Sequence, residues 1–487
     1  MDYLDPKKQF QHRIILLVGY VCVALAIVIA TIILLYQAYG FGLGQHGSVI
    51  QNGLVFISSK PVSAQISIDG VNKSQTSSRI LLPSGIYQLK LSRLGYRDWN
   101  HVLDIQGGSV SHYDYPLLFP INLTSVSLHN YVNAPTLTTQ SPDKRWLLVQ
   151  TLNSSTLDVF DLNNPKKLPV LLTLPLNIVS KSTSSESWQT IEWADDNQHL
   201  LLQHNFDGKS EYILVDRQNV EQSINLNVNL VISSSQISLR NQKFDQYYVY
   251  DSTAATLKTT SLSSSLQTAL LERVLAYKSL GSDTVVFITD TLATAGTVQL
   301  NLQIGNQLYS LRSLPSSGKY LFNLAHYDGS LYIAVSNVID GKVYVFKDPP
   351  TQLKAQPTKA VVPIRTLHID NPSYLSFSSD SSQYLIAENG SQFNVLDLRY
   401  NNDYKYLINS NIDGPRTYAN WIDSSHLTYV SNGKLMVFDF DGNNQQTLIP
   451  SSSALASVLS ADSKFLYYFS GNTAGGIDFN QTSLLAN

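Results

Sequence analysis

The segment Gln140-Ser-Pro-Asp-Lys-Arg-Trp-Leu-Leu-Val149 places an aspartate turn between two short apolar runs, and the same arrangement returns further along the chain. An aspartate carboxylate can accept hydrogen bonds from backbone N–H groups two or three residues further on, so it favours a turn at this point. Each of the better copies then continues into a hairpin and a third apolar strand. The turn aspartates of the five copies are Asp143, Asp196, Asp380, Asp423 and Asp462.

The spacing of these aspartates predicts the number of repeats. Neighbouring copies lie 53, 43 and 39 residues apart, and the 184 residues between Asp196 and Asp380 leave room for three eroded copies of about 46 residues. Periods of about 40 to 50 residues built from four short strands are typical of β-propeller blades. We therefore expect residues 121–487 to form a propeller of eight blades, with seven as the alternative. Residues 123–128 are expected to complete the last sheet and close the ring.

The repeats resemble the WD40-like propeller repeats of bacterial envelope proteins of the TolB type, whose signature reads Trp-Ser-Pro-Asp-Gly. Ser141-Pro142-Asp143 is the best match, and the tryptophan is kept at Trp193 and Trp421. The glycine after the aspartate is kept in no copy. One aspartate per repeat at the same turn indicates a backbone-capping role, and the tryptophans are most simply core residues.

Residues 53–120 predict a separate, smaller β-module. Segments 54–59, 64–68 and 86–92 alternate polar and apolar residues, and Asp69-Gly70 is a hairpin-turn signal. Such alternation is typical of a small antiparallel sandwich with one face in water.

This module resembles the PEGA domain, a small extracytoplasmic β-module named for a four-residue motif. Val62 and Ser63 stand where the motif has Glu and Gly, so the outer Pro and Ala carry that part of the match. The resemblance implies a cell-envelope setting and brings no catalytic residues. The motif positions that we expect to be structural are Pro61, Ala64, Asp69, Gly70, Gly85, Gly95 and Tyr96.

Upstream of the module, residues 14–36 read IILLVGYVCVALAIVIATIILLY and carry no charge. Roughly 20 apolar residues span the hydrocarbon core of a bilayer, so this segment predicts a transmembrane helix. A buried core helix would show a polar face, and a cleavable signal peptide has an apolar core of only about 7 to 15 residues. The expected membrane-anchor residues include Ile14, Leu16, Val21, Ile27, Ile32 and Tyr36.

The charges around this span predict its orientation. Three basic residues precede it, whereas residues 37–53 contain no Lys or Arg. The positive-inside bias therefore predicts a cytoplasmic tail of residues 1–13, with the bulk of the chain extracytoplasmic. The glycine-rich residues 37–52 indicate a flexible tether.

Composition narrows the class of protein. Charged residues make up 14% of the chain and its net charge is −3, which argues against nucleic acid as a partner. The one cysteine, Cys22, lies inside the expected span, so the exported part can form no disulfide. These features favour a bacterial surface protein over a disulfide-stapled ectodomain.

No motif in the sequence carries recognisable catalysis. The ten histidines include no His-Glu-x-x-His, no pair four apart and no His-x-His, and there is no Gly-x-Ser-x-Gly elbow or Walker loop. We therefore expect no catalytic residues, no cofactor and no metal site.

Three local features have both a structural and a functional interpretation. The acidic cluster of Glu192, Asp195 and Asp196 is expected to be a solvated blade edge rather than an acid site. The tyrosine-rich segment 247–250 could line a binding surface, and alternation predicts that half of its side chains are exposed. Segment 439–444 begins like a calcium loop but lacks the final glutamate, so we expect a hairpin turn.

Function must be argued from this architecture. We expect a membrane-anchored extracytoplasmic binding or scaffold protein of the cell envelope, whose propeller face recognises a protein, peptide or glycan. One alternative is an envelope enzyme, a glycan lyase, hydrolase or cyclase, with carboxylates and a histidine converging in the propeller channel. Another is a structural component of a surface layer, and the sequence leaves the oligomeric state open.

Overall fold

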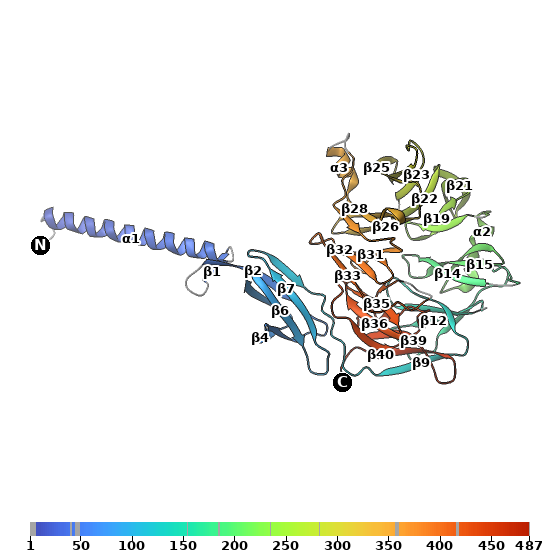
Figure 1. Cartoon of the computed structure of the whole chain (residues 1–487), viewed down its shortest axis with the longest axis horizontal. Helices are drawn as coiled ribbons and strands as arrows, with labels where there is room; N and C mark the ends of the chain where they lie inside the picture. The colour runs from blue at the N-terminus through green and yellow to red at the C-terminus, as the bar shows by residue number, and fades with distance from the viewer. Residues whose placement is uncertain are drawn as a thin grey trace. The chain divides into compact units, whose positions relative to one another are not determined.

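The computed structural model describes residues 6–38, 41–43, 49–152, 154–183, 186–233, 235–281, 283–355, 360–414 and 418–486. The chain divides into two compact units, Met1–Ile121 with Ala486–Asn487, and Asn122–Leu485. Figure 1 shows one long helix followed by a chain made almost entirely of β-strands.

The long helix α1 spans Pro6–Ala38. Its part Gln9–Tyr36, 28 residues, is long and apolar enough to cross a membrane, and none of its most apolar window is buried against the rest of the protein. A helix whose whole surface is apolar is stable in a lipid bilayer or in the core of a large protein. The expected anchor residues are all exposed on it: Ile14, Leu16, Val21, Ile27, Ile32 and Tyr36.

The expected tether, residues 37–52, is partly a strand pair. Residues 39–40 and 44–48 lie outside the described residues, but Phe41–Leu43 form β1 and pair with the start of β2, Val49–Ile57. The glycine-rich composition hid this pairing, because a three-residue strand needs only backbone N–H and C=O groups to form.

The rest of the first unit is a two-sheet β-module with an apolar core between the sheets. Asp69 and Gly70, at φ of 49° and 77°, form the expected turn between β3 and β4. One strand pair, β2 with β8, is parallel, so the expectation of a purely antiparallel sandwich is wrong for that pair. One sheet contains β1, β2, β5 (Ser78–Pro83) and β8 (Val110–Tyr113); the other contains β4 (Val71–Gln75), β3 (Gln65–Ile68), β6 (Gly85–Ser92) and β7 (Trp99–Ile105).

The second unit consists, over its described residues, of eight four-stranded antiparallel sheets, which is the propeller of eight blades. Blade 1 consists of β10 (Pro135–Gln140), β11 (Trp146–Thr151), β12 (Thr156–Asp161) and β13 (Val170–Thr173), and blade 2 of β14 (Glu186–Trp193), β15 (His199–Phe206), β16 (Lys209–Asp216) and β17 (Ile224–Asn225). Blade 3 consists of β18 (Gln236–Arg240), β19 (Lys243–Asp251), β20 (Thr256–Ser261) and β21 (Ser264–Leu271), and blade 4 of β22 (Val274–Leu280), β23 (Thr284–Thr289), β24 (Thr297–Ile304) and β25 (Gln307–Pro315).

The remaining four blades follow the same order, and three blades fall between Asp196 and Asp380 as the spacing predicted. Blade 5 consists of β26 (Tyr320–Tyr327), β27 (Ser330–Asn337), β28 (Lys342–Lys347) and β29 (Arg365–His368), and blade 6 of β30 (Tyr374–Phe377), β31 (Tyr384–Asn389), β32 (Gln392–Asp397) and β33 (Asn402–Leu407). Blade 7 consists of β34 (Asn420–Trp421), β35 (His426–Ser431), β36 (Lys434–Asp439) and β37 (Gln446–Pro450), and blade 8 of β38 (Val458–Leu459), β39 (Phe465–Gly471), β40 (Ile477–Ser483) and β9 (Ser125–Tyr131). Short helices α2 (Leu226–Asn229), α3 (Pro349–Ala355), η3 (Val220–Gln222) and η4 (Val338–Asp340) lie in the connections.

Strand β9 closes the ring. It pairs with β40, so the first strand of this unit completes the last blade, as expected for residues 123–128, although β9 runs from Ser125 to Tyr131. The side chain of Asn130 donates to Asp478 Oδ1 at 2.7 Å in the same pair. Closure removes the two free sheet ends that an open row of blades would expose.

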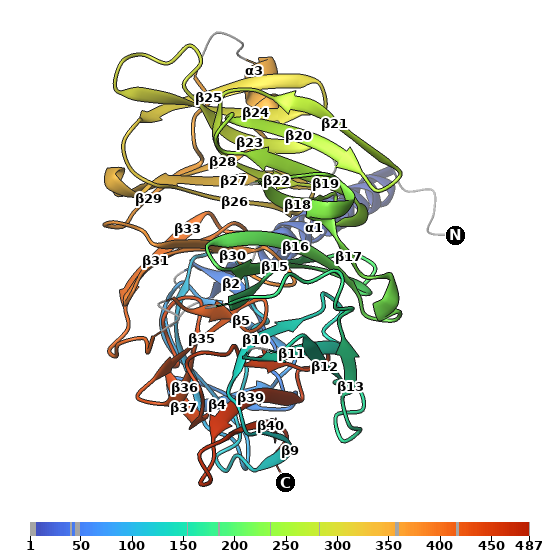
Figure 2. The same ribbon diagram turned by 90° about the vertical axis from the view of Figure 1, so that its right-hand side faces the viewer.

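The apolar core lies between neighbouring blades. Leu148 and Val159 of blade 1 pack with Leu200 and Ile213 of blade 2, and comparable clusters join blades 4 and 5, blades 5 and 6, and blades 8 and 1. The two middle strands of most blades are therefore buried on both faces. The first strands of several neighbouring blades contact each other. In Figure 2, blade 1 can be followed outward from β10 to β13.

We predict that Phe479→Ala weakens ring closure. Phe479 is fully buried on β40, and its ring centroid lies 4.7 Å from that of Phe160 in blade 1. Deleting such a side chain costs about 3–5 kcal/mol, because the cavity collapses only in part. Thermal unfolding of the full chain should show a clear loss of stability, whereas Val132→Ala, at an exposed position, should change little. Equal stability of the two variants would contradict the closure argument.

Candidate functional site

The five turn aspartates all lie between the first and second strands of their blades. Asp143 Oδ1 accepts from the N–H of Arg145, and Asp462 Oδ1 from that of Lys464. Asp196 and Asp423 each accept from two backbone N–H groups two and three residues on, at 2.8–2.9 Å. These four carboxylates cap backbone turns.

Asp380 departs from this pattern. Asp380 itself has a left-handed backbone conformation, with φ of 68°. In three other turns the residue after the aspartate has this conformation instead, namely Lys144, Asn197 and Ser463. Those residues occupy the place of the signature glycine and adopt a conformation that costs an ordinary L-residue about 1–2 kcal/mol. The turn geometry is thus retained without the glycine that usually makes it easy.

A buried histidine links two aspartates of blade 7. His426 Nδ1 lies 2.8 Å from Asp423 Oδ2, and its Nε2 lies 3.3 Å from Asp439 Oδ1. Burial lowers the pKa of His426, but the charges of Asp423 and Asp439 outweigh this effect and raise the pKa to about 10. Burial acts to raise the pKa of Asp423, but His426 and the turn N–H groups lower it to about 2.

Blade 2 repeats this arrangement less tightly. His199 Nδ1 lies 2.6 Å from Asp196 Oδ2, and its Nε2 lies 3.6 Å from Asp216 Oδ2. The second aspartate of each set ends the third strand of its blade, and sequence reasoning gave it no role. The sequence does contain a signal for this His–Asp–Asp set. A histidine stands three residues after the turn aspartate, and a second aspartate stands at the end of the third strand.

The tryptophans join blades. Trp193 is buried, and its Nε1 donates to Thr139 Oγ1 of blade 1 at 2.9 Å. Trp421 is half-buried and stacks on Tyr384 of blade 6 with ring centroids 6.3 Å apart. Both therefore pack between blades rather than face a ligand.

One ion pair joins two blades that are not neighbours in the ring. Lys144 Nζ lies 2.6 Å from Asp380 Oδ2, and these residues belong to the turns of blades 1 and 6, which are not neighbours. Beside this pair, Asn197 Oδ1 accepts from the N–H of Asp143, and Ser379 Oγ donates to the carbonyl of Asp423. These contacts join the corresponding turns of blades 1 and 2 and of blades 6 and 7.

The inner strands of the blades carry few charged groups. Their carboxylates are Glu186 and Glu192, at opposite ends of β14. Six residues at about 3.3 Å each place them roughly 20 Å apart, whereas paired glycosidase carboxylates lie about 5–10 Å apart. Within the described ranges, no group of three or more His, Cys, Asp or Glu residues is arranged to hold a metal ion.

The expectation of a solvated acidic edge is wrong for Glu192. This residue is half-buried, its carboxylate accepts from the N–H of Leu239, and burial raises its pKa. Asp195 is exposed as expected, and Asp196 is held by His199. A register shift between Thr190 and Glu192 marks the irregular pairing at this position, which a simple reading of charge density does not reveal.

The tyrosines of segment 247–250 also differ from expectation. Tyr247, Tyr248 and Tyr250 are all buried, and the hydroxyl of Tyr250 donates to the carbonyl of Val274 at 2.9 Å. Alternation fails here because β19 is a middle strand with a neighbouring blade against each face. These side chains are core residues and form no binding surface.

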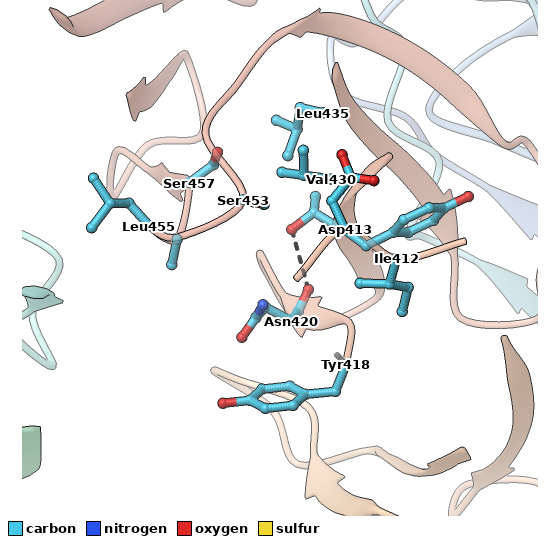
Figure 3. Close-up of a pocket in the computed structure, with 12 residues that line it drawn as sticks. Ile412, Asp413, Tyr418, Asn420, Val430, Leu435, Ser453, Leu455 and Ser457 are labelled. Carbon is cyan, nitrogen blue, oxygen red and sulfur yellow. Dashed lines mark hydrogen bonds between the residues drawn. The ribbon is translucent and has the colours of Figure 1, made fainter. Parts of the chain in front are cut away.

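A small cavity lies between blades 7 and 8. Figure 3 shows Asp413, Tyr418, Asn420 and Ser457 around it, and Thr428 Oγ1 donates to the carbonyl of Asn420 at 3.3 Å. The cavity measures about 20 Å³, room for about one water molecule. The buried hydroxyl of Ser457 has no partner within the described residues, so a water is the occupant that this space and this hydroxyl suit.

The PEGA-motif positions stabilise the first unit. Ala64 is fully buried, and its N–H donates to Thr76 Oγ1. Asp69 Oδ1 accepts from the N–H of Gln88 at 2.8 Å, while Tyr96 is buried and its hydroxyl accepts from the N–H of Ala486. Pro61, Gly70, Gly85 and Gly95 lie in the connections and strand ends around them, the three glycines with positive φ.

The fold and these surfaces define a β-propeller chain that carries a small β-module and one candidate membrane helix. The family model of the PEGA domain matches residues 52–118, so the chain contains a PEGA domain. No curated protein sequence matches this chain.

Several solved propellers are similar to the chain. They include the Dos1 propeller (15% identity, 75% of this chain and 96% of that chain, TM-score 0.47), an oligogalacturonate lyase in complex with manganese (11%, 75% and 98%, 0.38) and the dihydro-heme d1 dehydrogenase NirN (13%, 65% and 66%, 0.42). At these identities the likeness concerns the fold alone, and these proteins include enzymes and non-enzymes. A propeller joined to a PEGA domain supports a binding or scaffold role.

We predict that His426→Gln destabilises the protein in a pH-dependent way. The pKa of His426 is raised by folding, so its contribution is complete below about pH 6.5 and is lost as the pH rises toward 10. Removing one partner of a buried ion pair costs about 3–5 kcal/mol. Thermal unfolding should therefore show a large deficit near pH 6 that narrows toward pH 10.

The matched control is His326→Gln, because His326 is exposed on β26. The thermal stability of this variant should equal that of the unsubstituted protein at every pH. A His426→Gln deficit that stays constant from pH 6 to 10 would refute the charged state of this histidine.

Proposed function

We propose that the chain is a membrane-anchored extracytoplasmic scaffold of the cell envelope, whose propeller binds a polypeptide partner. The helix α1 would hold the chain in the membrane, and the PEGA domain and then the propeller follow it in sequence. The low charge of the chain, with a net value of −3, suits a protein or peptide partner better than nucleic acid.

The observation that carries this proposal is the position of the exposed apolar side chains. Large apolar residues are exposed on the outer strand of blade 1 and in the segments beside it, Leu168, Val170, Leu171 and Leu176. Neighbouring exposed apolar side chains mark interaction sites. The inner strands, by contrast, have their two carboxylates roughly 20 Å apart, which gives the channel-enzyme alternative little support.

Topology is tested by cysteine labelling. We predict that Val62→Cys, at an exposed position of the PEGA domain, reacts with a membrane-impermeant maleimide in intact cells. Lys8→Cys should react only after permeabilisation, because the positive-inside bias keeps this end in the cytoplasm. The native Cys22 should stay unlabelled in both states, and labelling of Lys8→Cys in intact cells would overturn the orientation.

Partner binding is tested by capture. Full-length tagged protein, cross-linked in its native membrane and purified, should carry one stoichiometric envelope polypeptide identified by mass spectrometry. The untagged chain serves as the control for carry-over. Recovery of the chain alone would contradict the scaffold proposal, and recovery of cross-linked copies of the chain would favour a surface layer instead.

A further inference from the structure

The outer strand of blade 1 has an open edge. Strand β13 pairs with β12 on one side, and it ends the order β10-β11-β12-β13 on the other. The N–H of Leu174 donates to the carbonyl of Ser155 on the β12 side at 3.0 Å. Because backbone groups alternate sides in an antiparallel pair, the N–H and C=O groups of Leu171 and Thr173 point outward, away from β12.

Prolines limit this edge to two residues. Pro169 and Pro175 stand at the two positions that continue the outward series, and proline has no N–H to donate. The open edge therefore offers two consecutive outward residues, Leu171 and Thr173, each with one donor and one acceptor. This is the hydrogen-bonding pattern of a site for one short added strand.

Exposed apolar side chains surround the same edge. Val170 and Leu171 are 53% and 65% exposed, and Leu168 and Leu176 on either side are 78% and 77% exposed. None of the other seven outer strands, all within the described residues, exposes more than one large apolar side chain. Several of those edges also carry charged side chains, such as Arg365 on β29, which discourage strand pairing.

Two cations stand at the beginning of the edge. Lys166 and Lys167 are exposed, and neither side chain has an ion-pair partner within the part of the chain that the structure describes. The segment from residue 168 to 176 contains no charge. An added strand would therefore meet apolar side chains along its length and two positive charges at one end.

We propose that β13 binds an extended polypeptide segment by antiparallel strand addition, with apolar residues along the strand and acidic residues at its C-terminal end beside Lys166 and Lys167. This inference deepens the scaffold function and rests on it. Backbone hydrogen bonds to Leu171 and Thr173 require a polypeptide rather than a glycan. The lysine pair selects acidic partners and offers no complementary charge to a second copy of β13.

The test uses the full chain in nanodiscs and a synthetic peptide of five alternating Val and Thr residues followed by two Glu. We expect amide hydrogen exchange to slow at Leu171 and Thr173 on peptide addition. The same peptide ending in two Lys should bind at least tenfold more weakly, and the double variant Lys166→Glu with Lys167→Glu should reverse this preference.

A pair of variants isolates the edge. Leu171→Asp should abolish the protection, whereas Leu308→Asp, the same change at a 61% exposed leucine on the outer strand β25, should leave it intact. Unchanged exchange at residues 170–174, or equal binding of both variants, would overturn the proposal. Protection that appears without peptide as protein concentration rises would overturn it in favour of a self-interface.

The scaffold function can fail separately. If capture from native membranes recovers the same partner with Leu171→Asp as with the unchanged chain, the partner binds elsewhere and the strand-addition proposal falls while the scaffold function stands. If no partner is recovered with either chain, the scaffold function itself falls.

Discussion

A single four-stranded blade cannot bury both of its faces, and the whole propeller follows from that constraint. Blade after blade, the two middle strands carry apolar side chains on both sides, so each sheet needs a neighbour on each side. The last free faces disappear only when β9 pairs with β40 across about 350 residues of sequence, which makes closure a long-range event. Such a ring depends on a few closing contacts, among them the tilted ring pair of Phe160 and Phe479.

Charged side chains in the turns between the first two strands of the blades stabilise those turns. An aspartate between the first two strands caps its own turn, and in blades 2 and 7 a histidine connects it to a second aspartate. Burying such charges is costly, and the cost is offset only while all partners remain in place. Lys144 and Asp380 add an ion pair between the turns of blades 1 and 6.

Repeats with a countable period were predictable from sequence, because one turn residue recurs wherever two strands meet. The blade number, the closing strand and the PEGA domain follow from such local signals. Burial within the blades was not predictable in the same way: Tyr247 and Tyr248 alternate in sequence yet are both buried, since β19 has a blade against each face. Glu192 sits at an irregular pairing that no charge count reveals. The uncharged run from 168 to 176 received no prediction from sequence, and its place at the end of a sheet leaves Leu168, Leu171 and Leu176 exposed.

An open apolar strand edge promotes aggregation in any β-protein. The edge at β13 has features that limit this risk. Two outward residues offer at most four main-chain hydrogen bonds, each worth about 0.5–1.5 kcal/mol in net terms, which is too little to hold an arbitrary strand against the entropy of ordering it. Pro169 and Pro175 keep the edge from extending, and Lys166 and Lys167 find no acidic residue in residues 168–176 of a second copy. Backbone pairing alone is therefore weak here, and affinity must come from apolar side chains and acidic groups that match this one edge. The same features that prevent aggregation thus make the edge selective.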